Sequence, residues 1–457
     1  MLLSNALILY SSLEWVWLRF PAALALTFVL PGWAWLSALD WMDTNDAVER
    51  IVLVVGCSSV LSALALLIAL LLPGPFTETP NLIALNLATL TGLLWGMAAK
   101  RGEWQMADGR WRISNTQRAR CLQSPISSLK SKILLILLVI VAVAAFTRLT
   151  RLGYAEFHED ELENMRLIVR AYKGEEYAPF LDSKGPIHWL LPAALWYLNG
   201  WVNEGIARTP FVITAVLLVP LIYSLGRRMA GGNDQIGLLA AGFVAINGFF
   251  VALARHVENR ALIVFWGALA LWFAYRYYKD GKDQFLLYAA LTLAIGLIAH
   301  PNVLLYLPVF IYLIWQKIRT EGSIGRQQWP WLLTAAFIFI GLTALFYIPY
   351  LTDPEIGLVY QYFASERVGE AFLYNLVWNI FVEDALYTTY YHAPVLVALL
   401  LWLLVRHFSQ WRWRGWVILG GLGVAILSTV IAPDLWIIAN VNLAFVPYVL
   451  LTLAFML

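Results

Sequence analysis

Long apolar runs separated by short polar segments make up most of the chain. Each of the longer runs can cross about 30 Å of hydrocarbon as a helix. These runs are 17–38, 50–73, 80–98, 133–149, 209–226, 235–253, 259–276, 284–300, 302–317, 330–350, 392–405, 415–432 and 436–457. They are too long and too evenly apolar for barrel strands, and lipid tolerates no unsatisfied backbone groups. We therefore predict an all-α, polytopic membrane bundle of about thirteen transmembrane helices.

The composition agrees with a membrane protein and excludes several classes of function. Hydrophobic residues make up 61% of the 457 residues and charged residues only 13%, against about 25% charged in an average soluble domain. The sequence has no glycine-rich phosphate loop and no polar segment large enough to hold a nucleotide sugar. We expect a lipid-linked substrate, contacts with membrane lipids and no nucleic-acid partner. With two cysteines, no disulfide framework is expected.

Lysine and arginine indicate the side of the membrane on which each loop lies. Segment 99–132 is strongly basic and is expected in the cytoplasm, which places the next loop, 150–208, outside. The later basic clusters also fall inside only if the short apolar segment 186–201, broken by Pro192, lies along the outer interface instead of crossing. The acidic loop 39–50 then lies inside, although acids have little influence on orientation.

The densest cluster of charge lies in the first outer loop. Five carboxylates within eight residues surround His158; they are Glu156, Glu159, Asp160, Glu161 and Glu163. Negative charge beside a membrane is costly unless it faces water, a cation or a substrate, so this block is the predicted reaction site. The plainer alternative is a solvated loop. Other polar helix ends on the same side are 254–260, 300–302 and 351–391.

Three motifs follow one another in this outer loop, Asp160-Glu161, Lys184-Gly185-Pro186 and Ala207-Arg208-Thr209-Pro210. Together with the predicted topology, they resemble the first outer loop of the GT-C membrane glycosyltransferases. The resemblance is strongest to glycosyltransferase family 39, which includes protein O-mannosyltransferases and lipid A aminoarabinose transferases. The turn from Arg255 to Glu258 and the segment from Tyr390 to Pro394 are similar to later parts of that family. Gly185 stands where a proline is common, and Glu258 where Asp is usual.

The resemblance covers 133–405 and divides the chain into three parts. Residues 1–132 are expected to form an N-terminal three-helix membrane extension with a basic cytoplasmic linker. Residues 133–405 are the GT-C-like catalytic core with outer-face interfacial helices, and 406–457 are the C-terminal transmembrane helices. The last run reaches Leu457 without a polar tail, which leaves open that the chain is truncated there.

The resemblance implies transfer of a sugar from a polyprenyl-phosphate donor to an acceptor hydroxyl, at an extracytoplasmic site of a multi-pass plasma-membrane protein. The reaction needs a base at the acceptor oxygen and cations at the phosphate. Asp160 is the predicted base, and Glu161 orients it or binds the acceptor. The family resemblance also implies inversion at the anomeric carbon, whereas retention needs two carboxylates about 5 Å apart. The candidates for the donor phosphate are Lys184, Arg166, Arg255 and His300. The candidates for acceptor binding or support are Glu258, His158 and His392.

Several of these residues also have a structural alternative. Glu159 and Glu163 share a helical face, on which they can pair with Arg166. Arg255 and Glu258 are three residues apart and can form an ion pair. Each of these contacts would use a charge that the proposed chemistry needs.

Three further questions are left open by the sequence. Lys184 can anchor a helix to lipid headgroups, and a divalent ion can bind His158 or His300 with carboxylates. No metal-ligand spacing is present, so no metal is assigned. The acceptor can be a protein, a glycan or a lipid. The alternative functions are a transporter or flippase of lipid-linked sugars, with the acidic loop as a gate for ions or substrate, and an inactive scaffold.

Overall fold

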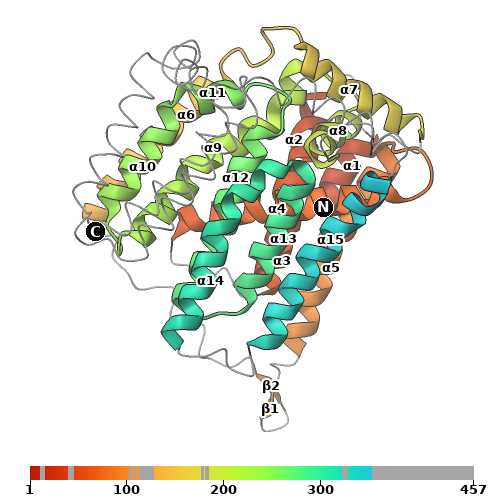
Figure 1. Ribbon diagram of the computed structural model, residues 1–457. Helices are drawn as coiled ribbons and strands as arrows, with labels where there is room; N and C mark the ends of the chain where they lie inside the picture. Colours follow the sequence, from red (N-terminus) through yellow and green to blue (C-terminus); the bar gives the residue numbers. More distant parts are fainter. Residues whose placement is uncertain are drawn as a thin grey trace.

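The computed structural model of the chain (Figure 1) describes residues 1–10, 16–39, 46–101, 105–107, 110–112, 128–175, 180, 185–321 and 328–352. In these ranges the regular structure is helical except for one hairpin of β1 (Gln105–Ala107) and β2 (Arg110–Arg112). The helices are α1 (Leu2–Tyr10), α2 (Val16–Phe28), α3 (Leu30–Ala38), α4 (Ala47–Leu71), α5 (Glu78–Arg101), α6 (Ser128–Leu149), α7 (Glu159–Tyr172), α8 (Ile187–Asn199), α9 (Glu204–Met229), α10 (Asp234–Ile246), α11 (Gly248–Leu253), α12 (Arg260–Asp280), α13 (Gln284–Ala299), the 3-10 helix η4 (Pro301–Tyr306), α14 (Leu307–Glu321) and α15 (Trp329–Thr352).

Eight of the described helical segments are long and apolar enough to cross a membrane. One of them, Trp17–Ala38, is α2 and α3 together, and another, Pro301–Thr320, joins η4 to α14. The runs predicted at 235–253 and 284–300 coincide with shorter apolar helices, α10 with α11 and α13. The predicted polytopic helical bundle is confirmed. The runs predicted after residue 391 lie outside the described residues.

Helix α12 lies in the middle of the bundle (Figure 1), with α9, α13 and α14 packed against it. Of its apolar stretch 89% is buried, whereas the corresponding figures for α6 and α15 are 17% and 11%. Large apolar side chains on these two helices are exposed, among them Leu135, Phe146 and Phe337. An apolar surface of this extent fits contact with membrane lipid.

Helix α8 occupies the segment for which an interfacial helix is predicted. The prediction covers 186–201, and the structure has the 13-residue helix Ile187–Asn199 there, shorter than the roughly 20 residues a crossing needs. This helix is buried among α2, α4, α5, α7 and α9. Its burial was not predicted, because a short apolar sequence does not reveal whether lipid or protein surrounds it.

The two ends of the bundle carry the loops that the charge pattern separates. In Figure 1 the β1–β2 hairpin of segment 99–132 lies at the opposite end from α7 and α8. At the N-terminus of α4, Glu49 pairs with Arg228 at 2.6 Å and Asp46 with Arg227 at 3.2 Å. Asp46 and Glu49, at the start of α4, therefore share their end of the bundle with the basic C-terminus of α9. These two acids, which seemed out of place in the sequence, have partners.

Candidate active site

The acidic block forms the start of helix α7. The Nδ1 atom of His158 accepts a weak hydrogen bond from the Asp160 amide at 3.4 Å. Glu161 completes a capping box, because its Oε2 accepts a hydrogen bond from the His158 amide at 2.9 Å. Glu159, Asp160 and Glu161 occupy the first turn, where the helix dipole favours negative charge. Part of the charge density in this loop therefore serves to begin the helix.

Glu161 and Arg208 form a buried ion pair behind this helix start. Arg208 of α9 donates from Nε to Oε1 at 2.8 Å and from Nη2 to Oε2 at 2.6 Å. The Arg208 and Glu161 side chains are 4% and 2% exposed. The other donors of the guanidinium bind the carbonyl oxygens of Leu152, Ala155 and Glu156. Arg208 thus fixes both α7 and the loop that precedes it to α9.

The Glu161 carboxylate accepts four hydrogen bonds. Two come from Arg208, and the other two come from the amides of His158 and Val257, at 2.9 and 2.7 Å. Burial raises the pKa of Glu161, but the hydrogen bonds and charge of Arg208 outweigh burial and hold that pKa below its usual value. Glu161 is therefore ionised, and its lone pairs are already used.

Asp160 faces away from Glu161, because consecutive residues of a helix point about 100° apart. Its side chain is 73% exposed, and one carboxylate oxygen lies 3.9 Å from His158 Nδ1. A hydrated carboxylate with unused lone pairs can accept a proton, whereas the carboxylate of Glu161 cannot readily do so. Of these two neighbouring carboxylates, that of Asp160 is exposed to water and that of Glu161 is buried and hydrogen-bonded.

The turn 254–259, between α11 and α12, lies against the buried pair. His256 is half-exposed, with Nδ1 3.8 Å from Glu161 Oε2, and its ring meets the His158 ring edge to face at 6.3 Å. Burial, together with the nearby Arg208 and His158, lowers the pKa of His256, although the carboxylates of Glu161 and Glu258 raise it. The ring is therefore neutral near pH 7. His256 was not among the predicted site residues, although its position in a polar outer turn was a usable signal.

Arg255 of the same turn caps a helix. Its guanidinium donates to four carbonyl oxygens at the end of α6, those of Thr147, Arg148, Thr150 and Arg151. Such carbonyls have no partner within their own helix, so an arginine satisfies them. Glu258 lies 3.1 Å from Arg260. The alternative of an Arg255–Glu258 ion pair is therefore wrong.

The remaining candidates for the donor phosphate differ in their surroundings. Arg166 pairs with Glu163 at 3.0 Å on the exposed face of α7, so the structural alternative for this arginine is confirmed. His300 is largely buried, and its Nδ1 accepts a hydrogen bond from the Asn302 amide at 3.0 Å, which caps η4. Lys184 and His392 lie outside the described residues.

Gly185, the residue after Lys184, has no room for a side chain. A Cβ atom at this position would stand 1.6 Å from the carbonyl oxygen of Ile298, near the end of α13. The absence of proline at this point, a departure from the family pattern, therefore has a steric cause. The close approach places Gly185 beside the C-terminus of α13, directly before His300.

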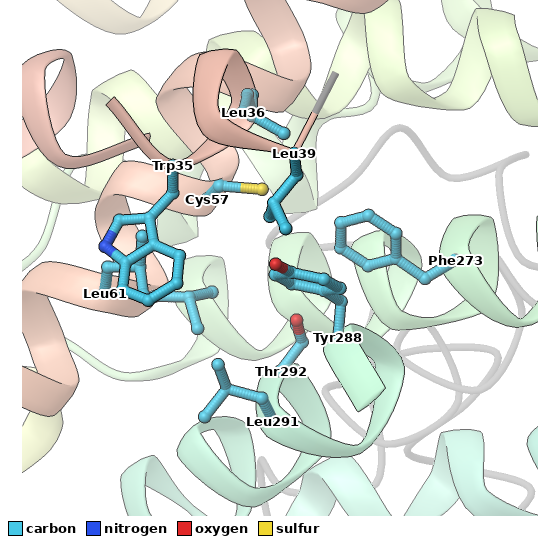
Figure 2. Close-up of a pocket in the computed structure, with 10 residues that line it drawn as sticks. Trp35, Leu36, Leu39, Cys57, Leu61, Phe273, Tyr288, Leu291 and Thr292 are labelled. Carbon is cyan, nitrogen blue, oxygen red and sulfur yellow. The ribbon is translucent and has the colours of Figure 1, made fainter. Parts of the chain in front are cut away.

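A crevice between α3, α4, α12 and α13 is lined mainly by apolar side chains, including Trp35, Leu61 and Leu291, together with Cys57 and Tyr288 (Figure 2). It contains no acid or base suited to sugar transfer. Within the described ranges, no group of three or more His, Cys, Asp or Glu side chains is placed to hold a metal ion.

Comparison with known proteins identifies a membrane glycosyltransferase domain of the GT-C type within the chain. Residues 183–347 match the model of a family described as dolichyl-phosphate-mannose-protein mannosyltransferase. The resemblance predicted from the sequence is confirmed over this segment, which begins beside Lys184 and includes α8, α9 and the turn 254–259. The function that this match supports is sugar transfer from a dolichyl-phosphate-linked donor. No curated protein matches the chain.

Proposed function

We propose that this protein transfers a sugar from a polyprenyl-phosphate donor to an acceptor hydroxyl on the extracytoplasmic face of the plasma membrane, with Asp160 as the general base. The observation that carries this proposal is the exposed Asp160 carboxylate at the start of a helix that the Glu161–Arg208 pair fixes in place. A base must be both accessible and well positioned, and Asp160 meets both conditions.

The reaction is an exchange at the anomeric carbon of the donor sugar. Asp160 takes the proton of the acceptor hydroxyl, whose oxygen attacks the anomeric carbon as the bond to the phosphate oxygen breaks. Polyprenyl phosphate leaves with the electrons of that bond. The adjacent carboxylate, Glu161, is occupied by four donors and is a poor nucleophile. This arrangement supports a single displacement with inversion, since retention needs a second reactive carboxylate about 5 Å away.

The leaving phosphate needs a cation, and we assign this role first to Lys184. Its neighbour in the sequence, Gly185, is packed against the end of α13. Arg255 is committed to carbonyl oxygens and Arg166 to Glu163, so neither is our first choice. His300 and the neutral His256 can contribute hydrogen bonds, and Glu258, His158 and His392 remain candidates for binding or supporting the acceptor.

A transporter is the alternative, and the described charges do not favour it. Transporters commonly place ionisable groups near the middle of the bilayer. Here the buried charges of spanning helices lie near helix ends, as with Glu49 in α4, Arg148 in α6 and Lys317 in α14.

The proposal is tested with Asp160→Asn, which keeps the shape of the side chain but removes its basicity. Membranes containing each variant receive tritiated dolichyl-phosphate mannose, the donor named in the family description, and transfer to endogenous acceptors is measured. We expect transfer to fall by about 10²–10⁴-fold. The matched control is Glu163→Gln, an exposed acid on the same helix, which should change the rate by no more than about twofold. Wild-type transfer by Asp160→Asn would remove this residue from the mechanism.

A further inference from the structure

A buried chain of hydrogen bonds crosses the site behind Asp160. His188 of α8 is fully buried, and its Nδ1 lies 2.7 Å from the carbonyl oxygen of Gly185. Its Nε2 lies 2.7 Å from Oδ1 of Asn164 on α7. The Nδ2 of Asn164 donates to the carbonyl oxygen of Val257 at 2.8 Å. Four residues from three separate segments are thereby linked.

The orientation of the Asn164 amide in this chain is fixed by its partners. The carbonyl oxygen of Val257 can only accept, so the amide nitrogen of Asn164 must face it. Its amide oxygen then faces His188, and the imidazole ring lies between two acceptor oxygens, those of Asn164 and Gly185. A neutral ring donates to one of these oxygens at a time, and the imidazolium donates to both. Each of the two contacts uses a different ring nitrogen, so each can be removed by a separate substitution.

Val257 is held by α7 through both of its backbone groups. Its amide donates to Glu161 Oε1 at 2.7 Å, and its carbonyl accepts from Asn164 at 2.8 Å. Glu161 and Asn164 are three residues apart and therefore lie on one face of the helix. Asp160 projects from the same first turn in another direction. The register of α7 against the turn 254–259 is thus set by two adjacent side chains.

We infer that Asn164 and His188 are positioning residues, which fix the helix that carries Asp160 relative to Gly185 and to the turn 254–259. This inference rests on the proposed function, because it takes Asp160 as the base. The bridge is buried, so water does not compete for its hydrogen bonds. A shift of about 1 Å between reacting groups can lower a rate about 10²-fold without weakening substrate binding.

The test removes each contact separately. His188→Asn places an amide near Nδ1 and keeps a donor for Gly185, whereas His188→Gln reaches Asn164 and gives up Gly185. Asn164→Asp still accepts from His188 but cannot donate to Val257. For all three variants we expect kcat to fall by about 10- to 100-fold, while KM for tritiated dolichyl-phosphate mannose changes by less than about threefold. His188→Leu, which removes both contacts of the ring, should lower kcat further.

The control is Tyr197→Phe, which removes a hydrogen bond of the same kind from the same pair of helices. The Tyr197 hydroxyl donates to the carbonyl oxygen of Ile168 at 2.7 Å and is buried between α8 and α7. This bond lies near the far end of α7, away from Asp160. Tyr197→Phe should lower the melting temperature by an amount similar to that of His188→Gln and leave kcat unchanged.

The outcomes separate this inference from the proposed function. If wild type transfers sugar, Asp160→Asn does not, and the His188 and Asn164 variants keep wild-type kcat, the positioning role is refuted and the proposed function stands. If kcat falls equally in Tyr197→Phe and His188→Gln, the bridge does not position Asp160 more than another hydrogen bond between the same two helices. If Asp160→Asn is fully active, Asp160 is not the base, and if wild type transfers no sugar, the proposed function itself fails.

Discussion

Replacement of Arg208 tests the buried ion pair that anchors α7. Arg208 makes five hydrogen bonds, two to Glu161 and three to carbonyl oxygens of the preceding loop. Lysine keeps the charge but has three donors on a single nitrogen, so Arg208→Lys loses at least two of the five hydrogen bonds. At roughly 1.5–3 kcal/mol for each hydrogen bond that involves a charged group, the free energy of unfolding should fall by about 3–6 kcal/mol.

Arg208→Leu is a harsher change, because it leaves the Glu161 carboxylate buried without its counter-charge. Breaking a buried pair in this way costs about 3–5 kcal/mol. The double variant Glu161→Gln/Arg208→Leu removes both charges and should be less destabilised than the sum of the two single variants. The difference, a coupling of roughly 0.5–3 kcal/mol, measures the interaction itself.

Equilibrium unfolding of the purified protein in mixed micelles measures each of these losses. Arg166→Leu is the control, because Arg166 forms its ion pair with Glu163 on the exposed face of the same helix, α7. An exposed pair contributes at most about 1 kcal/mol. The reasoning is refuted if Arg208→Leu costs no more than Arg166→Leu, since α7 would then not depend on the buried pair.

Two further predictions concern the same region. Gly185→Ala should lower the melting temperature, because its Cβ would stand 1.6 Å from the Ile298 carbonyl oxygen and overpacking costs about 1–3 kcal/mol or more. Gly341→Ala is the control, since nothing lies within 4 Å of its added Cβ. An unchanged melting temperature for Gly185→Ala would show that a side chain fits at position 185. The pKa of Glu161 is lowered from 4.5, so its contribution to stability is present above that value and is lost as the pH falls through the lower folded pKa. Unfolding measured between about pH 3 and 6 should show this loss in wild type and not in Glu161→Gln.

The transmembrane helices could be predicted from the sequence because length and apolarity are local properties. The runs at 50–73 and 209–226 coincide with α4 and α9 for this reason. The burial of α8 could not be predicted, because it depends on helices far away in the sequence that cover it. The same limit applies to the partners of charged residues. Arg208 was part of a recognised motif, yet nothing local indicated that its partner would be Glu161.

For the functional residues, too, the sequence indicated candidates but not the contacts that they make with distant segments. Asp160 and Glu161 were found from charge density and family resemblance, but sequence alone could not show which of them would be buried. Arg255 was a reasonable phosphate ligand until the structure placed its guanidinium on the carbonyl oxygens of α6. His256 was missed because its closeness to Glu161 arises only when α11 and α12 bring the turn against α7.

The difference between Asp160 and Glu161 also bears on why this loop carries so many acids. A single carboxylate cannot both anchor α7 and accept a proton, because the hydrogen bonds that anchor it lower its pKa and use its lone pairs. Placing two acids in adjacent helical positions separates the tasks, since one side chain points inward to Arg208 and the other outward to water. The position of Asp160 then depends on the contact between Glu161 and Arg208. If Asp160 is the base that we propose, loss of the Arg208 anchor should therefore impair sugar transfer even where the protein remains folded.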